Sequence, residues 1–309
     1  MRPTELAGKA LAAFDGFQSR HKPLAFAVAV VKKFGEDRAG GSAGLIAYYG
    51  FFALFPLLLV LVAVLGFVLQ GHPALQASVL AAAKRDFPSL ADYLKVGSVS
   101  GSGIALAIGI LAALWAGLGV AGAAQHAMNS IWQVPRESQP NMWKSRLRSL
   151  LLLSILGTAL LLSTAASALN GVGGPFAMLF AIAGILAPLA LNLALYLLAF
   201  RLLTVERLSW REVLPGAVGG AVAWTLLQWL GGYYTRHVVA HATHIYGTFA
   251  VVIGLLAWLH LGAQVTLFAA ETNTVLRDKM WPRRLTGPRE GEPIEVRVSA
   301  DRPDAPGKA

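Results

Sequence analysis

One long stretch without charge constrains this chain more than any other feature. From Ala39 to Ala83 the sequence contains no Asp, Glu, Lys or Arg. Its centre, Gly44 to Leu69, would make a helix of about 39 Å, which is longer than the ~30 Å hydrocarbon core of a bilayer. Apolar side chains would point in every direction, whereas a helix of a soluble protein needs a polar face. The stretch therefore predicts a transmembrane helix, with Pro56 as a kink that neighbouring helices can accommodate.

Further uncharged runs predict that the chain crosses the membrane six times. The run from Ser149 to Phe200 is long enough for two spans, with a turn at 170–175 where Asn, Gly and Pro gather. We therefore expect an all-α polytopic bundle with short amphipathic surface helices at 70–98. The six spans are predicted at about 44–69, 103–132, 147–169, 176–200, 213–234 and 246–270.

The ends of the chain differ from this membrane domain in composition. Residues 1–38 combine an apolar run, Leu24–Val31, with basic side chains, which suits an amphipathic segment lying in the headgroup region. Residues 39–276 form the predicted membrane domain. The segment 277–309 is charged and rich in Pro, and we expect it to be mostly disordered.

The distribution of Lys and Arg predicts the orientation. Of the 26 Lys and Arg residues, 22 fall in segments on the same side of the predicted membrane as the N-terminus, and 4 fall on the opposite side. Because cytoplasmic loops carry the excess of cations, both termini are predicted to be cytoplasmic. This orientation explains most of the net charge of +10, so that charge favours membrane lipids rather than nucleic acid as the partner.

Polar side chains inside the spans are few, and such residues usually have a function. His260, Gln264 and Glu271 would lie on one face of the last span. We expect a polar cavity that opens to the cytoplasm, or alternatively a set of hydrogen bonds between helices in which Glu271 pairs with Arg201. The residues expected to border the cavity are Tyr48, Tyr49, Gln125, Asn129, Arg201, His260, Gln264 and Glu271.

The sequence carries no pattern typical of an enzyme. It lacks HExxH, the phosphate-binding GxxxxGK[ST] and GxSxG, so we expect no catalytic residue and no cofactor. The absence of cysteine excludes disulfides and thiolate metal sites. Three imidazoles could share a helical face at His237, His241 and His244, but no carboxylate or cysteine accompanies them, and we expect no metal there.

Three segments are similar to a known family. AYYGFFALFPLLL (47–59), WREVLPGAVGGAVAW (210–224) and IYGTFAVVIGLLAWLHLGAQVTLFAAETNTVL (245–276) resemble the YihY/BrkB family, also called ribonuclease BN-like. The resemblance implies a six-span protein of the bacterial inner membrane that supports envelope integrity and exports lipid or lipopolysaccharide. It also implies that the ribonuclease name is a misassignment.

The sequence departs from the family pattern at three positions. The family usually has Tyr where His260 stands, Gly where Ala269 stands, and Pro near Thr204. These differences weaken the transfer of individual residue roles and leave the expected fold unchanged.

Three functions are compatible with these features. The first is an envelope-maintenance protein that translocates, or helps translocate, a lipid-like substrate. The second is a membrane scaffold that binds envelope proteins through its surface helices and termini. The third is a transporter of small solutes or ions, with a watery cavity lined by His260, Gln264 and Glu271. Ribonuclease activity is not expected, because lipid headgroups explain the basic loops 134–148 and 201–212 equally well.

Overall fold

The computed structural model describes residues 15–18, 20–68, 103–141, 143–155, 177–206, 208–234 and 248–282. Within these ranges the chain is helical, with turns and no strand, which confirms the all-α class. The helices are α2 (Lys22–Glu36), α3 (Ala39–Val68), α6 (Gly103–Ile131), a helical stretch at 143–155, α8 (Ala177–Leu203), α9 (Trp210–Tyr234) and α11 (Thr248–Arg277), with a short 3-10 helix η1 (Arg136–Ser138).

Three helices contain a segment long and apolar enough to cross a membrane. These segments are Ala39–Val60 in α3, Leu106–Ile131 in α6 and Val252–Arg277 in α11. They coincide with the first, second and sixth predicted spans. In α8 the stretch Leu189–Leu203 is apolar but shorter.

The remaining spans stay predictions. Helices α8 and α9 have nearly the bounds expected for the fourth and fifth spans. Most of the third span at 147–169 lies outside the described residues, as do the turn at 170–175, the surface helices at 70–98 and the tail beyond residue 282.

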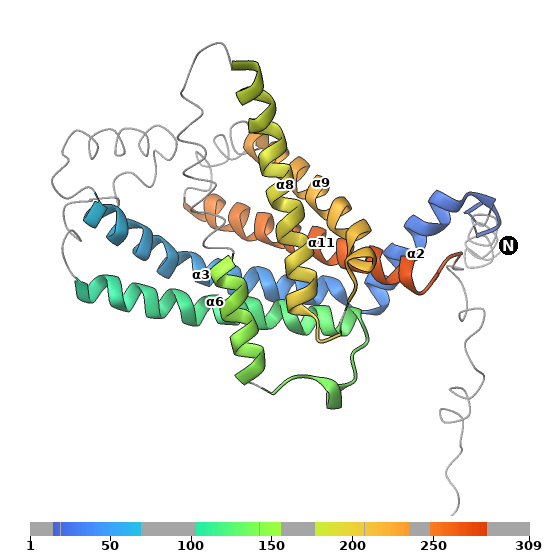
Figure 1. The fold of residues 1–309 in the computed structure, drawn as a ribbon, viewed down its shortest axis with the longest axis horizontal. Coiled ribbons are helices and arrows are strands. Elements are labelled where there is room, and N and C mark those ends of the chain that lie inside the picture. The colour runs from blue at the N-terminus through green and yellow to red at the C-terminus, as the bar shows by residue number, and fades with distance from the viewer. Residues whose placement is uncertain are drawn as a thin grey trace, which may run out of the picture.

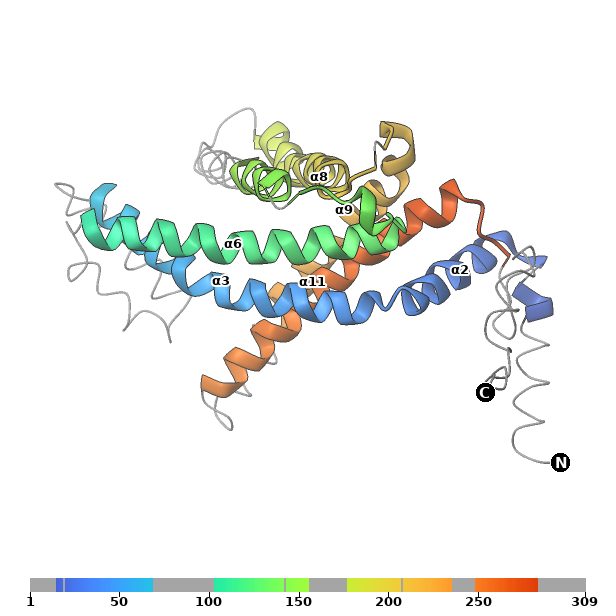
Figure 2. The same ribbon diagram turned by 90° about the horizontal axis from the view of Figure 1, so that it is seen from below.

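Helix α11 joins two pairs of helices. Helices α3 and α6 pack side by side, and α8 packs against α9. Figure 1 shows α11 between these pairs, and it contacts α3, α9 and α2. Figure 2 shows α2 continuing from the beginning of α3 and lying beside the end of α11. Helix α11 is therefore the element that holds the described structure together.

Small residues let α9 and α11 approach closely along their length. A Cβ atom on Gly216 would lie 2.1 Å from the carbonyl oxygen of Ala269, so only glycine fits there. Farther along, the ring of Trp258 occupies the space beside Gly231, within 2.2 Å of the place where a Cβ would be. Close backbone approach of this kind is a common way to hold transmembrane helices together.

The core lies at one end of the bundle. We call the ends of the helices near Ala39, Ile131, Leu203, Trp210 and Arg277 the charged ends, and the opposite ends the distal ends. The buried apolar residues gather near the charged ends and include Ala43, Ala47, Ala127, Met128, Ile131, Phe200, Val213, Ala217, Leu267 and Ala270. Large apolar residues nearer the distal ends are exposed, among them Phe55, Leu58, Ile108, Leu111, Trp115, Phe249 and Ile253.

Candidate functional site

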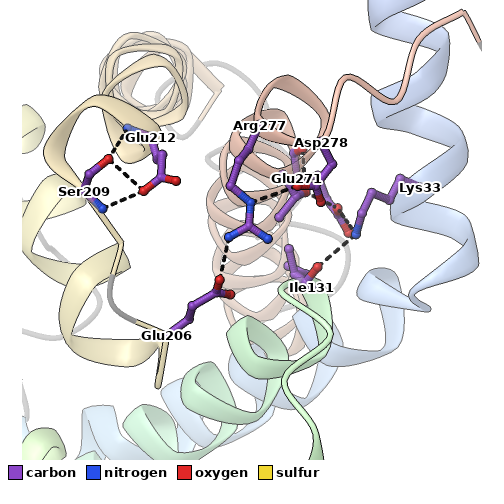
Figure 3. A network of polar contacts seen from close by, with 9 residues as sticks. Lys33, Ile131, Glu206, Ser209, Glu212, Glu271, Arg277 and Asp278 are labelled. Atoms are coloured by element: carbon purple, nitrogen blue, oxygen red, sulfur yellow. Dashed lines mark hydrogen bonds and ion pairs between the residues drawn. The ribbon is translucent and has the colours of Figure 1, made fainter.

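A buried lysine is the centre of the polar contacts at the charged ends. The side chain of Lys33, in the last turn of α2, is 2% exposed. Its Nζ lies 3.0 Å from Oε2 of Glu271 and also pairs with the carboxylate of Asp37. The same nitrogen donates a hydrogen bond of 2.9 Å to the carbonyl oxygen of Ile131 (Figure 3). A charge buried this deeply is tolerated only when it has such partners.

Three helices end around this lysine. Helix α2 ends at Glu36, α6 ends at Ile131, and α11 ends at Arg277. The last carbonyl groups of a helix lack partners inside the helix and give its C-terminus a partial negative charge. Lys33 therefore pairs with the carboxylates of Glu271 and Asp37 and also donates to one of these carbonyls.

Each of the three ends has a non-glycine residue in the left-handed region directly after the helix. The φ angle is 52° at Arg38, 50° at Gln133 and 50° at Lys279. After α6, the N–H of Val134 donates to the carbonyl oxygen of Asn129 at 2.9 Å, which is the bonding pattern of a Schellman cap. The ends of these helices are therefore fixed in place by backbone hydrogen bonds.

Glu271 keeps one oxygen free of protein partners. Its Oε2 pairs with Lys33 and accepts a hydrogen bond of 3.3 Å from the hydroxyl of Thr274. Its Oε1 is buried without a hydrogen-bond partner among the residues that the structure describes. Two carboxylates, Glu271 and Asp37, thus share one lysine, so the trio carries a net negative charge when all three groups are ionised.

A second group of contacts ties the segment after α8 to α11. Nη1 of Arg277 lies 2.8 Å from Oε1 of Glu206, and its Nε lies 2.9 Å from Oδ1 of Asp278. The guanidinium also stacks over the ring of Trp132, at 4.6 Å from the ring centre. Figure 3 shows that Arg277 and Glu271 come from neighbouring turns of the same helix.

Two of the expected cavity residues instead bind neighbouring segments. Nε2 of Gln125 donates to Oγ of Ser149 at 2.9 Å, which connects α6 to the helical stretch 143–155. Oδ1 of Asn129 accepts a hydrogen bond of 3.2 Å from the backbone N–H of Val205. Both side chains are buried in contacts between elements.

Three others lie along the seam between α3 and α11. Nε2 of Gln264 lies 3.1 Å from Nε2 of His260, and both side chains are half-buried. The imidazole Cε1 of His260 would be 4.0 Å from a Cβ on Gly44, so His260 faces α3. Tyr48 is on α3 one turn beyond Gly44, and its ring is exposed. This group of Tyr48, His260 and Gln264 is named the seam group.

The structure does not join Arg201 to Glu271. The guanidinium of Arg201 stacks over the ring of Trp210 at 4.1 Å and is exposed, whereas Glu271 is fully buried against Lys33. The predicted pair is therefore wrong, because the cation that reaches Glu271 comes from α2. The remaining candidate, Tyr49, packs its ring against α6, with Cδ1 2.9 Å from the place of a Cβ on Gly119.

Three residues of these contacts were not predicted from the sequence: Lys33, Asp37 and Asn273. Lys33 lies outside the uncharged runs, although its spacing of four and eight residues from Ala29 and Ala25 places it on the buried face of α2. Oδ1 of Asn273 accepts a hydrogen bond of 2.6 Å from the N–H of Gly216, and the available signal was an amide two residues after Glu271 in the last predicted helix.

The described residues contain no group of three or more His, Cys, Asp or Glu that could hold a metal ion. The histidines at 237, 241 and 244 lie outside the described residues.

Comparisons with known proteins place the chain among membrane proteins. The family model "Virulence factor BrkB" matches residues 30–293. A UPF0761 membrane protein of Stenotrophomonas maltophilia (strain K279a) is 27% identical over 281 residues, which cover 83% of this chain and 62% of the relative. One of Pseudomonas aeruginosa (strain LESB58) is 27% identical over 272 residues, covering 84% of this chain and 64% of the relative.

A UPF0761 membrane protein of Pseudoalteromonas translucida (strain TAC 125) is 25% identical over 253 residues, which cover 76% of this chain and 80% of the relative. The chain therefore spans less than two thirds of the length of the first two relatives and more of the third. No solved structure matches the chain.

Proposed function

This chain belongs to the BrkB family of membrane proteins, and we propose that it serves the bacterial envelope by translocating, or helping to translocate, a lipid-like substrate. In this proposal the protein lies in the inner membrane with both termini in the cytoplasm. The lipid moves along the helices near their distal ends, and its headgroup contacts the seam group of Tyr48, His260 and Gln264.

The observation that carries the proposal is the uneven packing of the bundle. Among the residues whose burial the structure describes, the core lies at the charged ends, and large apolar side chains nearer the distal ends are exposed. In Figure 1 the distal ends of α3 and α8 point in different directions. Acyl chains could therefore reach α11 from the side without a large rearrangement of the packed core.

The seam group supplies polar atoms on this otherwise apolar route. The imidazole of His260 and the amide of Gln264 are half-buried, and the hydroxyl of Tyr48 belongs to an exposed ring. Such groups donate and accept hydrogen bonds with phosphate and ester oxygens. Tyr48 lies in the half of α3 nearer its charged end, and His260 and Gln264 lie near the middle of α11.

The proposal is tested by lipid crossing in proteoliposomes. Purified protein would be reconstituted with a fluorescent phospholipid, and the fraction of label that becomes accessible to a membrane-impermeant quencher would be followed over time. We expect crossing with the wild type and slower crossing with His260→Leu. The matched control is Leu226→Ala, on the exposed face of α9 and away from the seam group, which should cross like the wild type.

One observation favours the scaffold as a second function. The side chains of Gln125 and Asn129 make hydrogen bonds to neighbouring segments, and the carboxylate of Glu271 pairs with Lys33. Such contacts are expected of a static bundle. If a well-folded wild type moves none of the native envelope lipids, the transport proposal fails. Capture of envelope proteins by the full chain would then support the scaffold.

A further inference from the structure

Helix α2 has two apolar faces, and the part of the chain that the structure describes covers only one of them. The covered face packs against the end of α11, where Ala29 and Val30 form a small core with Val275 and Met280. Phe26 adds to this core, with its ring edge-on to Trp281. Lys33 extends the same face and reaches Glu271.

The opposite face of α2 is apolar as well. Leu24, Ala27, Val28 and Val31 follow one another at the spacing of a single helical face. Val31 is 61% exposed, and Phe17, in the helical turn that precedes α2, is 56% exposed. A shallow hollow of about 280 Å³ is lined by Ala27, Val28, Val31 and Lys32. Leu24, Ala27, Val28 and Val31 are called the outer face of α2.

The charges beside the outer face are mostly positive. Arg20 and Arg38 are exposed, and Lys32 lines the hollow. Glu36 offsets part of this charge, since its carboxylate lies 3.9 Å from Nζ of Lys32. An apolar stripe beside several cations is complementary to anionic phospholipid, because the acyl region accepts the apolar side chains and the phosphates attract the cations.

The position of α2 in the chain brings this face close to a bilayer. Helix α2 ends at Glu36, and the membrane-spanning segment of α3 begins at Ala39. The tether is therefore too short to carry α2 far from the membrane surface. A protein partner would need the same narrow face, which offers little beyond four small or medium apolar side chains.

We propose that the outer face of α2 binds the surface of an anionic phospholipid bilayer. Helix α2 then lies between lipid on its outer face and α11 on its covered face, and the Lys33–Glu271 pair joins the lipid-bound helix to the last span. The inference requires that the chain resides in a membrane. It does not require that the chain moves lipid.

The test uses the full chain and a single cysteine. Because the chain has no cysteine, Val31→Cys provides one site for an environment-sensitive fluorophore. The labelled protein is placed in nanodiscs of phosphatidylcholine alone or of phosphatidylcholine mixed with phosphatidylglycerol. We expect a blue-shifted emission that is quenched by lipids with a spin label near the headgroup, and both effects should grow with phosphatidylglycerol.

Two labelled positions serve as controls, one that faces lipid and one that faces water. A label at Leu214→Cys, exposed in the first turns of α9, should be quenched in both compositions, and one at Glu137→Cys, exposed in η1, should be quenched in neither. Adding Lys32→Gln to the Val31→Cys protein should lower the ratio of lipid-exposed to water-exposed label roughly fivefold, since one cation near an anionic surface contributes on that order.

Two outcomes would overturn the inference. A Val31 label that behaves like the Glu137 label in both lipid compositions would show that the outer face of α2 lies in water. A blue shift without quenching by the lipid spin labels, which disappears on dilution of the protein in the membrane, would identify a second copy of the chain as the occupant.

Discussion

Replacing Lys33 by Met should destabilise the protein strongly. The substitution keeps most of the volume of the side chain and removes the charge. It leaves the carboxylates of Glu271 and Asp37 and the carbonyl of Ile131 without their shared partner. Breaking a buried ion pair by removing one partner costs about 3–5 kcal/mol, and Glu271 is fully buried, so little solvent screening reduces that cost.

The assay is thermal unfolding in detergent, followed by the fraction of protein that remains monodisperse. If the entropy of unfolding scales with chain length as in soluble proteins, a loss of 3–5 kcal/mol lowers Tm by about 5–8 °C. Glu271→Gln should cost less, roughly 1–3 kcal/mol, because Lys33 keeps Asp37 and the carbonyl of Ile131 as partners.

The double variant separates a specific pair from a general loss of packing. Lys33→Met combined with Glu271→Leu removes both charges, and it should be more stable than the sum of the single effects predicts, with a coupling of about 0.5–3 kcal/mol. Additive effects, or a Lys33→Met protein that unfolds at the wild-type temperature, would refute the reasoning.

Two further predictions concern α9. Gly216→Ala should lower the free energy of unfolding by about 1–3 kcal/mol or more, because the new Cβ would lie 2.1 Å from the carbonyl oxygen of Ala269. Gly219→Ala, where a Cβ meets nothing within 4 Å, should leave Tm unchanged or raise it slightly. Equal effects of the two substitutions on Tm would contradict the packing. The hydroxyl and N–H of Ser209 donate hydrogen bonds to Glu212 and lower its pKa below the ordinary 4.5. The stability that this cap contributes is therefore present above pH 4.5 and is lost as the pH falls through the lowered pKa. Ser209→Ala should make Tm fall less steeply with acid, and an unchanged dependence of Tm on pH would argue against the cap.

The helices long and apolar enough to span a membrane were predictable because absence of charge over a long run leaves few alternatives. The uncharged runs that begin at Ala39 and Val96 contain the apolar segments of α3 and α6, and the run that ends at Ala270 covers most of the apolar segment of α11. The packing of these helices against one another was harder to predict from the sequence. A helix that is apolar on all sides shows no preferred face, so its sequence does not say which neighbour it will contact.

Glu271 shows what the sequence could predict and what it could not. It was singled out from the sequence because an ionisable group in an apolar helix needs a partner. The partner expected was Arg201, the cation nearest to the same end of a span. The actual partner, Lys33, belongs to a helix before the first span, and only the packing of α2 on α11 brings the two charges to 3.0 Å.

The glycines of α9 were easier to interpret. The four-residue spacing of Gly216 and Gly220 favours close packing of membrane helices, and the structure places both against α11. The large partner at Gly231 could not have been predicted, because it depends on the register that brings Trp258 of α11 to that position.

The orientation of the charged ends is the central claim of the proposed function, which places them and both termini in the cytoplasm. It can be measured with single cysteines in this cysteine-free chain, using a maleimide reagent that does not cross the inner membrane. We predict that Val172→Cys, in the segment 170–175, is labelled while the inner membrane is intact. Glu137→Cys, beside the charged ends, should be labelled only after that membrane is disrupted. The reverse pattern would place the charged ends outside the cytoplasm and contradict the account.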